Sequence, residues 1–221
     1  DRFVELPSRL DDDRKRLWEL TYRVNGSSMR GEMDDIVRDA TEVVASSRRL
    51  GVDYRGLFWC TTVLGVCSWA ADDHEGVARS IDDIRSLVGS TNDPALRIQG
   101  DFLTTLASIG NTETTGPVRQ HLRRCATGQL ASGESDAIVI LAAIAEDEGD
   151  ISRARTLILT PMSPSATGQW LAMRILAERL GVIDELLAHR QAQATASRPS
   201  IGLDVAKRTL HTELERRAWL D

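Results

Sequence analysis

The chain has no apolar run long enough to cross a bilayer. The longest such stretch, from Ala137 to Ala145, is far shorter than the ~20 residues that a membrane-spanning helix needs. The first residues, Asp-Arg-Phe-Val-Glu, lack the basic and apolar regions of a secretory signal peptide. The sequence therefore predicts no membrane partner and a cytoplasmic location.

Cysteine and lysine are scarce. The three cysteines, Cys60, Cys67 and Cys125, form no CxxC pair, which favours a reducing compartment over a disulfide framework. Lysine occurs only at Lys15 and Lys207, so arginine carries nearly all of the positive charge. With 27 basic and 33 acidic residues the net charge is −6, which argues against direct binding of nucleic acid.

Aromatic residues and strand patterns are also rare. Phe, Trp and Tyr make up 5% of the chain, and the Asn25-Gly26 pair is not flanked by β-branched strands. The six prolines fall where helices could start or stop. The sequence therefore predicts an all-α protein.

Apolar residues recur at spacings of three and four through most of the chain, which predicts a succession of helices. Aspartates crowd the first turn of the first segment, and Gly51 ends the second one. The expected helices are 10–24, 32–50, 54–71, 75–88, 95–109, 118–130, 135–148, 151–159, 167–180, 183–194 and 201–220.

Turns of one kind separate alternate helices. Gly149-Asp150 is the clearest of them, because glycine suits a left-handed helix end and aspartate caps the helix that follows. Similar turns occur at Asp72-Asp73, Gly110-Asn111 and Gly181. Their spacing fits a helix–turn–helix unit of about 34 residues with insertions. The sequence thus predicts an array of repeats.

These residues resemble tetratricopeptide repeats, in which Leu-Gly and an aromatic residue precede a Gly-Asp turn and an alanine. Here Leu64-Gly65 precedes Trp69, and Gly149-Asp150 precedes Ala154. The stretch 64–69, Leu-Gly-Val-Cys-Ser-Trp, is also similar to the sensor arrays of large LuxR- and MalT-type ATP-dependent bacterial transcription regulators. The repeat resemblance covers about residues 51–194.

The resemblance implies a right-handed α-solenoid of about five antiparallel helix pairs plus a C-terminal capping helix. We expect a single domain over 1–221, with a helix pair at 1–50, repeat units at 51–194, and a linker and capping helix at 195–221. In such arrays the first helices line a concave groove. The groove residues that the resemblance implies are Trp59, Thr62, Val66, Trp69, Arg97, Thr104, Asp136, Ala143, Glu146, Glu178 and Arg179.

The function implied by the resemblance is non-catalytic binding of a protein, a peptide or a small effector. The parent expected from it is a larger bacterial transcription regulator, in which this segment is the sensor. The chain starts without Met, which agrees with a piece of a longer protein. A free-standing adaptor or scaffold is the alternative, and the ligand and the oligomeric state stay open. We expect no cofactor and no metal.

Acidic pairs offer a third interpretation, a helical metal-dependent enzyme. The best-spaced set is Glu32, Asp34, Asp35 and Asp39. Capping of helix starts and solvated faces are the ordinary use of such acids, so we do not favour this interpretation. Neither lysine lies in a GxxxxGK phosphate loop, which excludes nucleotide hydrolysis of that kind by this segment.

Other clusters have ordinary explanations. Cys60, Cys67 and His74 are spaced too widely for one zinc site, so we interpret the cysteines as buried apolar residues. His121 and Cys125 share a helix face without a third partner, which argues against a nucleophile–base pair. The basic cluster Arg119, His121, Arg123 and Arg124 is interpreted as a solvated helix face. Among the tryptophans, we expect Trp59 in the groove and the others in the core.

Overall fold

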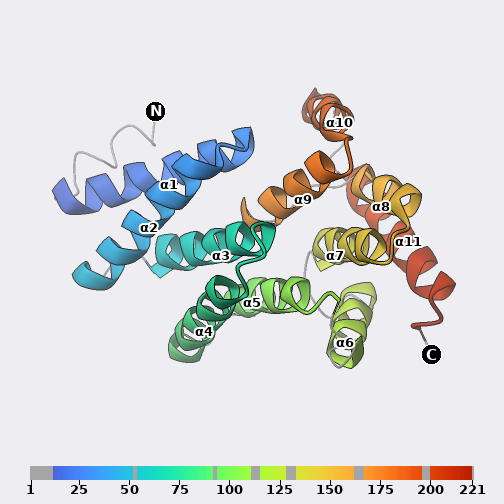
Figure 1. Cartoon of the computed structure of the whole chain (residues 1–221), viewed down its shortest axis with the longest axis horizontal. Coiled ribbons are helices and arrows are strands. Elements are labelled where there is room, and N and C mark those ends of the chain that lie inside the picture. Colours follow the sequence, from blue (N-terminus) through green and yellow to red (C-terminus); the bar gives the residue numbers. More distant parts are fainter. Residues whose placement is uncertain are drawn as a thin grey trace. The chain divides into compact units, whose positions relative to one another are not determined.

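In the computed structural model, all regular structure of the described residues is helical (Figure 1). The structure describes residues 12–51, 54–91, 94–110, 115–127, 133–161, 167–195 and 200–220. The helices in these ranges are α1 (Asp12–Arg30), α2 (Met33–Leu50), α3 (Tyr54–Ala70), α4 (His74–Thr91), α5 (Pro94–Ala107), α6 (Thr115–Ala126), α7 (Gly133–Asp147), α8 (Ile151–Ile158), α9 (Thr167–Arg179), α10 (Ile183–Thr195) and α11 (Ser200–Arg216). The predicted all-α class is confirmed.

Helix boundaries agree with the sequence pattern within about four residues except at the end of α1. That helix continues from Val24 through Asn25-Gly26 to Arg30. Ser28 is buried there, and its hydroxyl donates a hydrogen bond to the carbonyl of Val24 at 2.7 Å. Tertiary burial and this internal bond therefore override the turn preference of the Asn-Gly pair.

The chain divides into two compact units, Asp1–Leu96 and Arg97–Asp221, and each is described by itself. The expected subdivision at 50/51 falls inside the first unit, where α2 packs against α3. The single repeat array over the whole chain stays a prediction.

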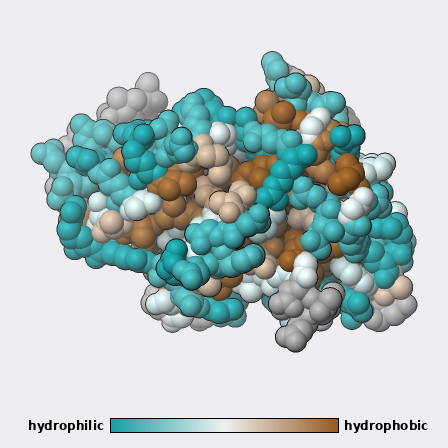
Figure 2. Space-filling model, viewed as in Figure 1, coloured by the Kyte–Doolittle hydropathy of each residue, from teal (hydrophilic) through white to brown (hydrophobic). Residues whose placement is uncertain are grey.

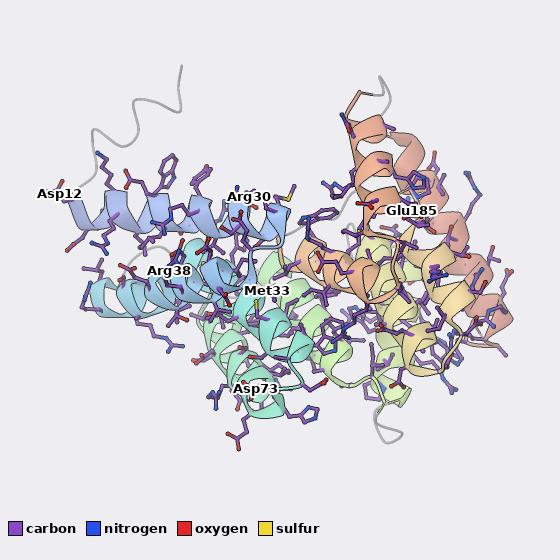
Figure 3. All side chains as sticks on the ribbon, turned by 45° about the horizontal axis from the view of Figure 1, so that its top comes forward. Asp12, Arg30, Met33, Arg38, Asp73 and Glu185 are labelled. Atoms are coloured by element: carbon purple, nitrogen blue, oxygen red, sulfur yellow. The ribbon has the colours of Figure 1, made fainter. Side chains whose placement is uncertain are left out.

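In the first unit, consecutive helices pack in pairs. α1 packs against α2 and α3 against α4, while α3 also contacts α1 and α2. The core-facing stripe of α1, whose ends are marked by Asp12 and Arg30 in Figure 3, consists of Leu17, Leu20 and Val24. Hydrophilic residues dominate the surface drawn over α1 (Figure 2), as expected of an amphipathic helix.

The second unit repeats these neighbour relations. α7 packs against α8 and α9 against α10, while α9 also contacts α7 and α8. In each unit, helices that follow one another in the chain therefore pack against each other.

α7 is the centre of the second unit, because α6, α8, α9 and α11 all pack against it (Figure 1). Every residue from Gly133 to Ala145 is buried. A helix surrounded in this way needs no polar face, which explains the apolar run in its sequence. In the part of the chain that the structure describes, no helix is both long and apolar enough to span a membrane.

The turn between α7 and α8 has the predicted chemistry. Gly149 has a φ of 78°, in the left-handed region that favours glycine. The side chain of Asp150 caps α8 by accepting a hydrogen bond from the backbone N–H of Arg153 at 3.0 Å. This combination of a left-handed end and an acidic cap is confirmed.

The turn before α4 also combines a left-handed residue with an acidic helix cap, but the left-handed residue is an aspartate. Asp72, which is not glycine, has a φ of 56°. Asp73 caps α4 by accepting a hydrogen bond from the N–H of Gly76 at 2.9 Å. Gly181 has a φ of 68°, and Gly110 one of 83°, whereas Asn111 lies outside the described residues.

The end of the chain is held by α6. Trp219 is 9% exposed, and its ring centroid lies 5.2 Å from the guanidinium carbons of both Arg119 and Arg217. Arg123 donates a hydrogen bond to the carbonyl of Trp219. The interpretation of the basic cluster on α6 as a solvated face is therefore wrong, since two of its arginines bind this terminal segment.

Candidate functional site

The predicted groove residues of the first unit lie on α3. Trp59 is 43% exposed and Trp69 is partly buried, whereas Thr62 and Val66 are buried. The hydroxyl of Thr62 donates a hydrogen bond to the carbonyl of Phe58 at 3.0 Å. Of these four residues, Trp59 is the one that is open to a partner.

The remaining groove residues lie in the second unit. Arg97, Glu178 and Arg179 are exposed, Thr104 and Glu146 are partly buried, and Asp136 and Ala143 are buried. Asp136 and Ala143 are covered because they belong to the enclosed helix α7. The groove stays a prediction, because its two halves lie in different units.

The structure does bring together the candidates at one end of α7 and α9. Glu146 and Arg179 form an ion pair at 3.6 Å, and Glu178 accepts a hydrogen bond from Arg174 at 2.9 Å. Burial raises the pKa of Glu146, although the charge of Arg179 acts in the opposite direction. The Glu146–Arg179 pair joins the ends of α7 and α9, whereas the Arg174–Glu178 bond lies within α9.

An open pocket of about 180 Å³, lined mostly by residues of polar types, lies between α5 and α6. Its lining residues are Asp101, Thr104, Thr105, Pro117, Gln120, His121 and Arg124. Thr104 is among the predicted groove residues. All of these lining residues belong to the second unit, so the geometry of the pocket is defined.

The pocket holds opposite charges that are only loosely paired. An Oδ2 of Asp101 lies 3.9 Å from an Nη1 of Arg124, and the two side chains are 38% and 40% exposed. A charge-assisted hydrogen bond is about 1 Å shorter, so both groups keep the capacity to bind a ligand. Thr104 and Thr105 donate their hydroxyls to helix carbonyls at 2.9 and 2.7 Å, which leaves their oxygens as acceptors.

Nε2 of His121, which lines this pocket, lies 3.8 Å from Sγ of Cys125 on the same helix. Burial lowers the pKa of His121, Asp101 raises it, and Arg124 lowers it further; the net shift is downward. Burial raises the pKa of Cys125 to about 12, so the thiol stays protonated at neutral pH. A neutral thiol of this kind is not an activated nucleophile.

The interpretation of the cysteines as buried apolar residues is confirmed. Cys60, Cys67 and Cys125 are all buried thiols outside any disulfide. Burial also raises the pKa of Cys67 to about 12.

The acidic set at the start of α2 is engaged by arginines. Asp39, whose side chain is 3% exposed, pairs with Arg23 at 2.7 Å and with Arg38 at 3.0 Å. Arg38, labelled in Figure 3, also pairs with Asp35 at 2.7 Å, and Arg30 pairs with Glu32 at 2.6 Å. Within the described residues, no group of three or more His, Cys, Asp and Glu side chains is placed to hold a metal.

A second hollow, of about 360 Å³, lies between α1 and α2 in the first unit. Leu17 and Leu20 form part of its wall. Arg16 and Glu42, which also line it, pair at 2.6 Å and satisfy each other. The α5–α6 pocket differs in that its opposite charges, Asp101 and Arg124, lie 3.9 Å apart, which leaves them more available to a polar ligand.

Sequence reasoning named Thr104 but missed its charged neighbours in the pocket. Asp101, Thr104 and Thr105 follow one another at spacings of three and four, which places them on one helix face. This spacing could have identified Asp101 as a pocket residue from the sequence. Arg124 could not be found in this way, because its position depends on how α6 packs.

Comparisons of the chain with protein-family models, with curated proteins and with solved structures gave no match. The resemblance to tetratricopeptide repeats and to regulator sensor arrays therefore stays a prediction.

Proposed function

We propose that this chain is a non-catalytic helical-repeat domain that binds a small polar effector between α5 and α6. In this proposal it is the sensor segment of a larger bacterial transcription regulator and works in the cytoplasm, where its free cysteines stay reduced. The observation that carries the proposal is the loose opposition of Asp101 and Arg124, at 3.9 Å, in a polar pocket.

The pocket favours a zwitterionic ligand. A ligand ammonium suits the carboxylate of Asp101, and a ligand carboxylate suits the guanidinium of Arg124. Sites for drug-sized ligands measure roughly 300–1,000 Å³. With about 180 Å³, this pocket accommodates a group of amino-acid size or the terminus of a peptide.

The packing of α6 supports a signalling role for the same pocket. α6 contacts both α7 and α11, which are the central and the last helix of the second unit. A ligand that changes the position of α6 therefore acts on the core of the unit. A sensor needs its ligand to bind one position of such a helix more tightly than another, because only then does binding shift the conformation.

Calorimetric titration of the individual α-amino acids and their N-acetyl and amide derivatives tests the proposal. We expect the free amino acid form of one member to bind, and both derivatives to bind at least about tenfold more weakly, since each loses one charge. Asp101→Asn and Arg124→Gln should weaken binding to a similar extent. Asp82→Asn, which changes an exposed acid of the first unit, is the matched control. Absence of binding across this set overturns the effector proposal.

Trp59 supports the second candidate function, an adaptor or scaffold. Exposed tryptophans are over-represented at the energetic centres of protein interfaces, and this one is 43% exposed. Affinity capture with wild type and Trp59→Ala should show a stoichiometric partner that the variant loses. Leu187→Ala, at a 38% exposed position of α10, serves as the control. Capture that is unchanged in Trp59→Ala argues against this surface.

A further inference from the structure

Trp170 on α9 and Arg190 on α10 form a stacked pair in the second unit. The guanidinium carbon of Arg190 lies 4.0 Å from the ring centroid of Trp170. Trp170 is 3% exposed, so the prediction that it is a core residue is confirmed. Its environment nevertheless differs from that of an ordinary core residue, because polar atoms of both partners are unsatisfied.

Two N–H donors of this pair have no acceptor. Nε1 of Trp170 and Nη1 of Arg190 are buried and make no hydrogen bond. A buried donor without an acceptor is destabilising, and such groups in native proteins call for a specific explanation. The guanidinium of Arg190 lies over the indole ring, so we expect one acceptor group to reach both donors.

The positive charge of Arg190 also lacks an acidic partner among the described residues. Its pKa is lowered by burial, and no acidic side chain in the part of the chain that the structure describes offsets this effect. Other arginines of the unit are treated differently: Arg179 pairs with Glu146, and Arg217 with Glu148. Among the described residues, the site therefore combines a partly buried cation and an unsatisfied indole donor with no paired anion.

The start of α9 adds to this positive potential. Trp170 is the fourth residue of the 13-residue helix Thr167–Arg179. Backbone N–H groups in the first turn of a helix lack intrahelical acceptors and carry a partial positive charge. An anion beside Trp170 and Arg190 is favoured by this charge as well.

We infer that Trp170 and Arg190 form a binding site for the carboxylate group of a ligand. The two carboxylate oxygens match the two unsatisfied donors, one from the indole and one from the guanidinium. A phosphate is a poorer match, because its charge of nearly −2 and its three acceptor oxygens exceed what one arginine and one indole supply. Arg190 as a residue is only partly buried, but its Nη1 and the indole Nε1 are both covered, so a carboxylate reaches the two donors only when the Arg190 side chain moves outward.

This inference does not rest on the proposed effector pocket. The pocket is formed by α5 and α6, whereas the stacked pair belongs to α9 and α10. Each site can therefore fail its test without affecting the other.

The indole N–H of Trp170 is a direct reporter of the inferred site. Two-dimensional ¹H–¹⁵N spectra of the full chain are recorded during titration with sodium acetate, and with sodium chloride at the same ionic strength. Comparison with Trp170→Phe identifies the Trp170 indole signal, since phenylalanine keeps an aromatic face and lacks the donor. We expect this signal to shift downfield and to saturate with acetate, and to move little with chloride.

Variants separate the two contributions to binding. Arg190→Gln removes the charge and should abolish the saturable response of the Trp170 signal, while Arg190→Lys keeps the charge and should weaken it about tenfold. Trp170→Phe is tested by thermal unfolding, in which acetate should raise the midpoint of the wild type but not of this variant. If the chemical shift of the Trp170 indole N–H does not change with acetate, or changes equally with chloride, the inference is overturned. A stronger response to phosphate than to acetate overturns the choice of carboxylate.

Discussion

Nε of Arg153 on α8 donates a hydrogen bond of 2.6 Å to Oε2 of Glu213 on α11. The side chain of Glu213 is fully buried, and its other oxygen accepts hydrogen bonds from Arg216 at 2.7 Å and from Arg217 at 2.9 Å. Arg217 in turn binds Glu148, at the end of α7, with two hydrogen bonds of 2.7 and 2.8 Å. One buried carboxylate thus joins α8 and α11, and through Arg217 the end of α7.

Replacement of this carboxylate should destabilise the second unit. Glu213→Gln leaves the buried parts of Arg153 and Arg217 without their negative partner, and we expect a loss of about 3 kcal/mol in the free energy of unfolding. Denaturant unfolding followed by circular dichroism measures it. Asp82→Asn, which removes an exposed partner of Arg85, should leave the stability nearly unchanged. Equal effects of the two variants would falsify the structural role of the network.

The same carboxylate predicts a dependence of stability on acidity. Burial raises the pKa of Glu213, but hydrogen bonds from Arg216, Arg153 and Arg217 outweigh burial and leave the pKa below its ordinary value. The stabilisation is therefore complete above the unfolded pKa of about 4.3 and disappears as pH falls through the lower folded value. We expect the stability difference between wild type and Glu213→Gln to be constant from pH 7 to pH 5. It should shrink in more acidic solution, and a difference that grows there contradicts this assignment.

Replacement by alanine should lower the free energy of unfolding at one glycine and raise it at another. Gly149 has a φ of 78° and no atom within 4 Å of an added Cβ, so Gly149→Ala should cost about 1 kcal/mol through backbone strain alone. Gly89 lies within α4, and an added Cβ there also meets nothing within 4 Å. Gly89→Ala should therefore stabilise by roughly 0.5–1 kcal/mol. Thermal unfolding of both variants provides the measurement, and a stabilised Gly149→Ala variant contradicts the left-handed turn.

Gly65 tests the packing of α3. The Leu64-Gly65 pattern predicts close helix packing at this glycine, and the structure shows that it is buried. Gly65→Val should cost roughly 1–3 kcal/mol by overpacking. Ala78→Val, at an exposed position of α4, controls for the lower helix propensity of valine. If both variants lose the same small amount of stability, no close packing exists at Gly65.

Thiol labelling checks the burial of the cysteines. Since burial raises the pKa of Cys67 and of Cys125 to about 12, the reactive thiolate is almost absent at pH 8. We expect iodoacetamide to leave both unmodified in the native protein and to modify them on unfolding, as measured by mass spectrometry. Rapid native labelling of Cys125 would instead support the nucleophile–base pair with His121.

The helices and their turns could be predicted because their causes are local. Apolar spacing placed all eleven helices of the described residues, and the Gly149-Asp150 turn was recognised from its capping chemistry. Where a local preference and the tertiary environment disagree, the prediction was wrong. Asn25-Gly26 lies inside α1, because the residues that follow it are buried and hydrogen-bonded within the helix.

The candidate sites show the limit of the same reasoning. The spacing of Asp101 and Thr104 on α5 is a local property, whereas the approach of Arg124 requires α6 to pack beside it. Nothing local distinguishes Arg190 from a solvated arginine either. Its stacking on Trp170 is a contact between two helices.

The sequence by itself determined the all-α class, the positions of the helices and the chemistry of their turns. Helical periodicity, capping and left-handed glycines act over a few residues, and each can be recognised from the order of the residues. Only the tertiary structure decided the division into two units, the enclosure of α7 and the burial of Glu213 among three arginines. These features depend on contacts between residues that are distant in the chain, and their free energy arises only when the helices pack.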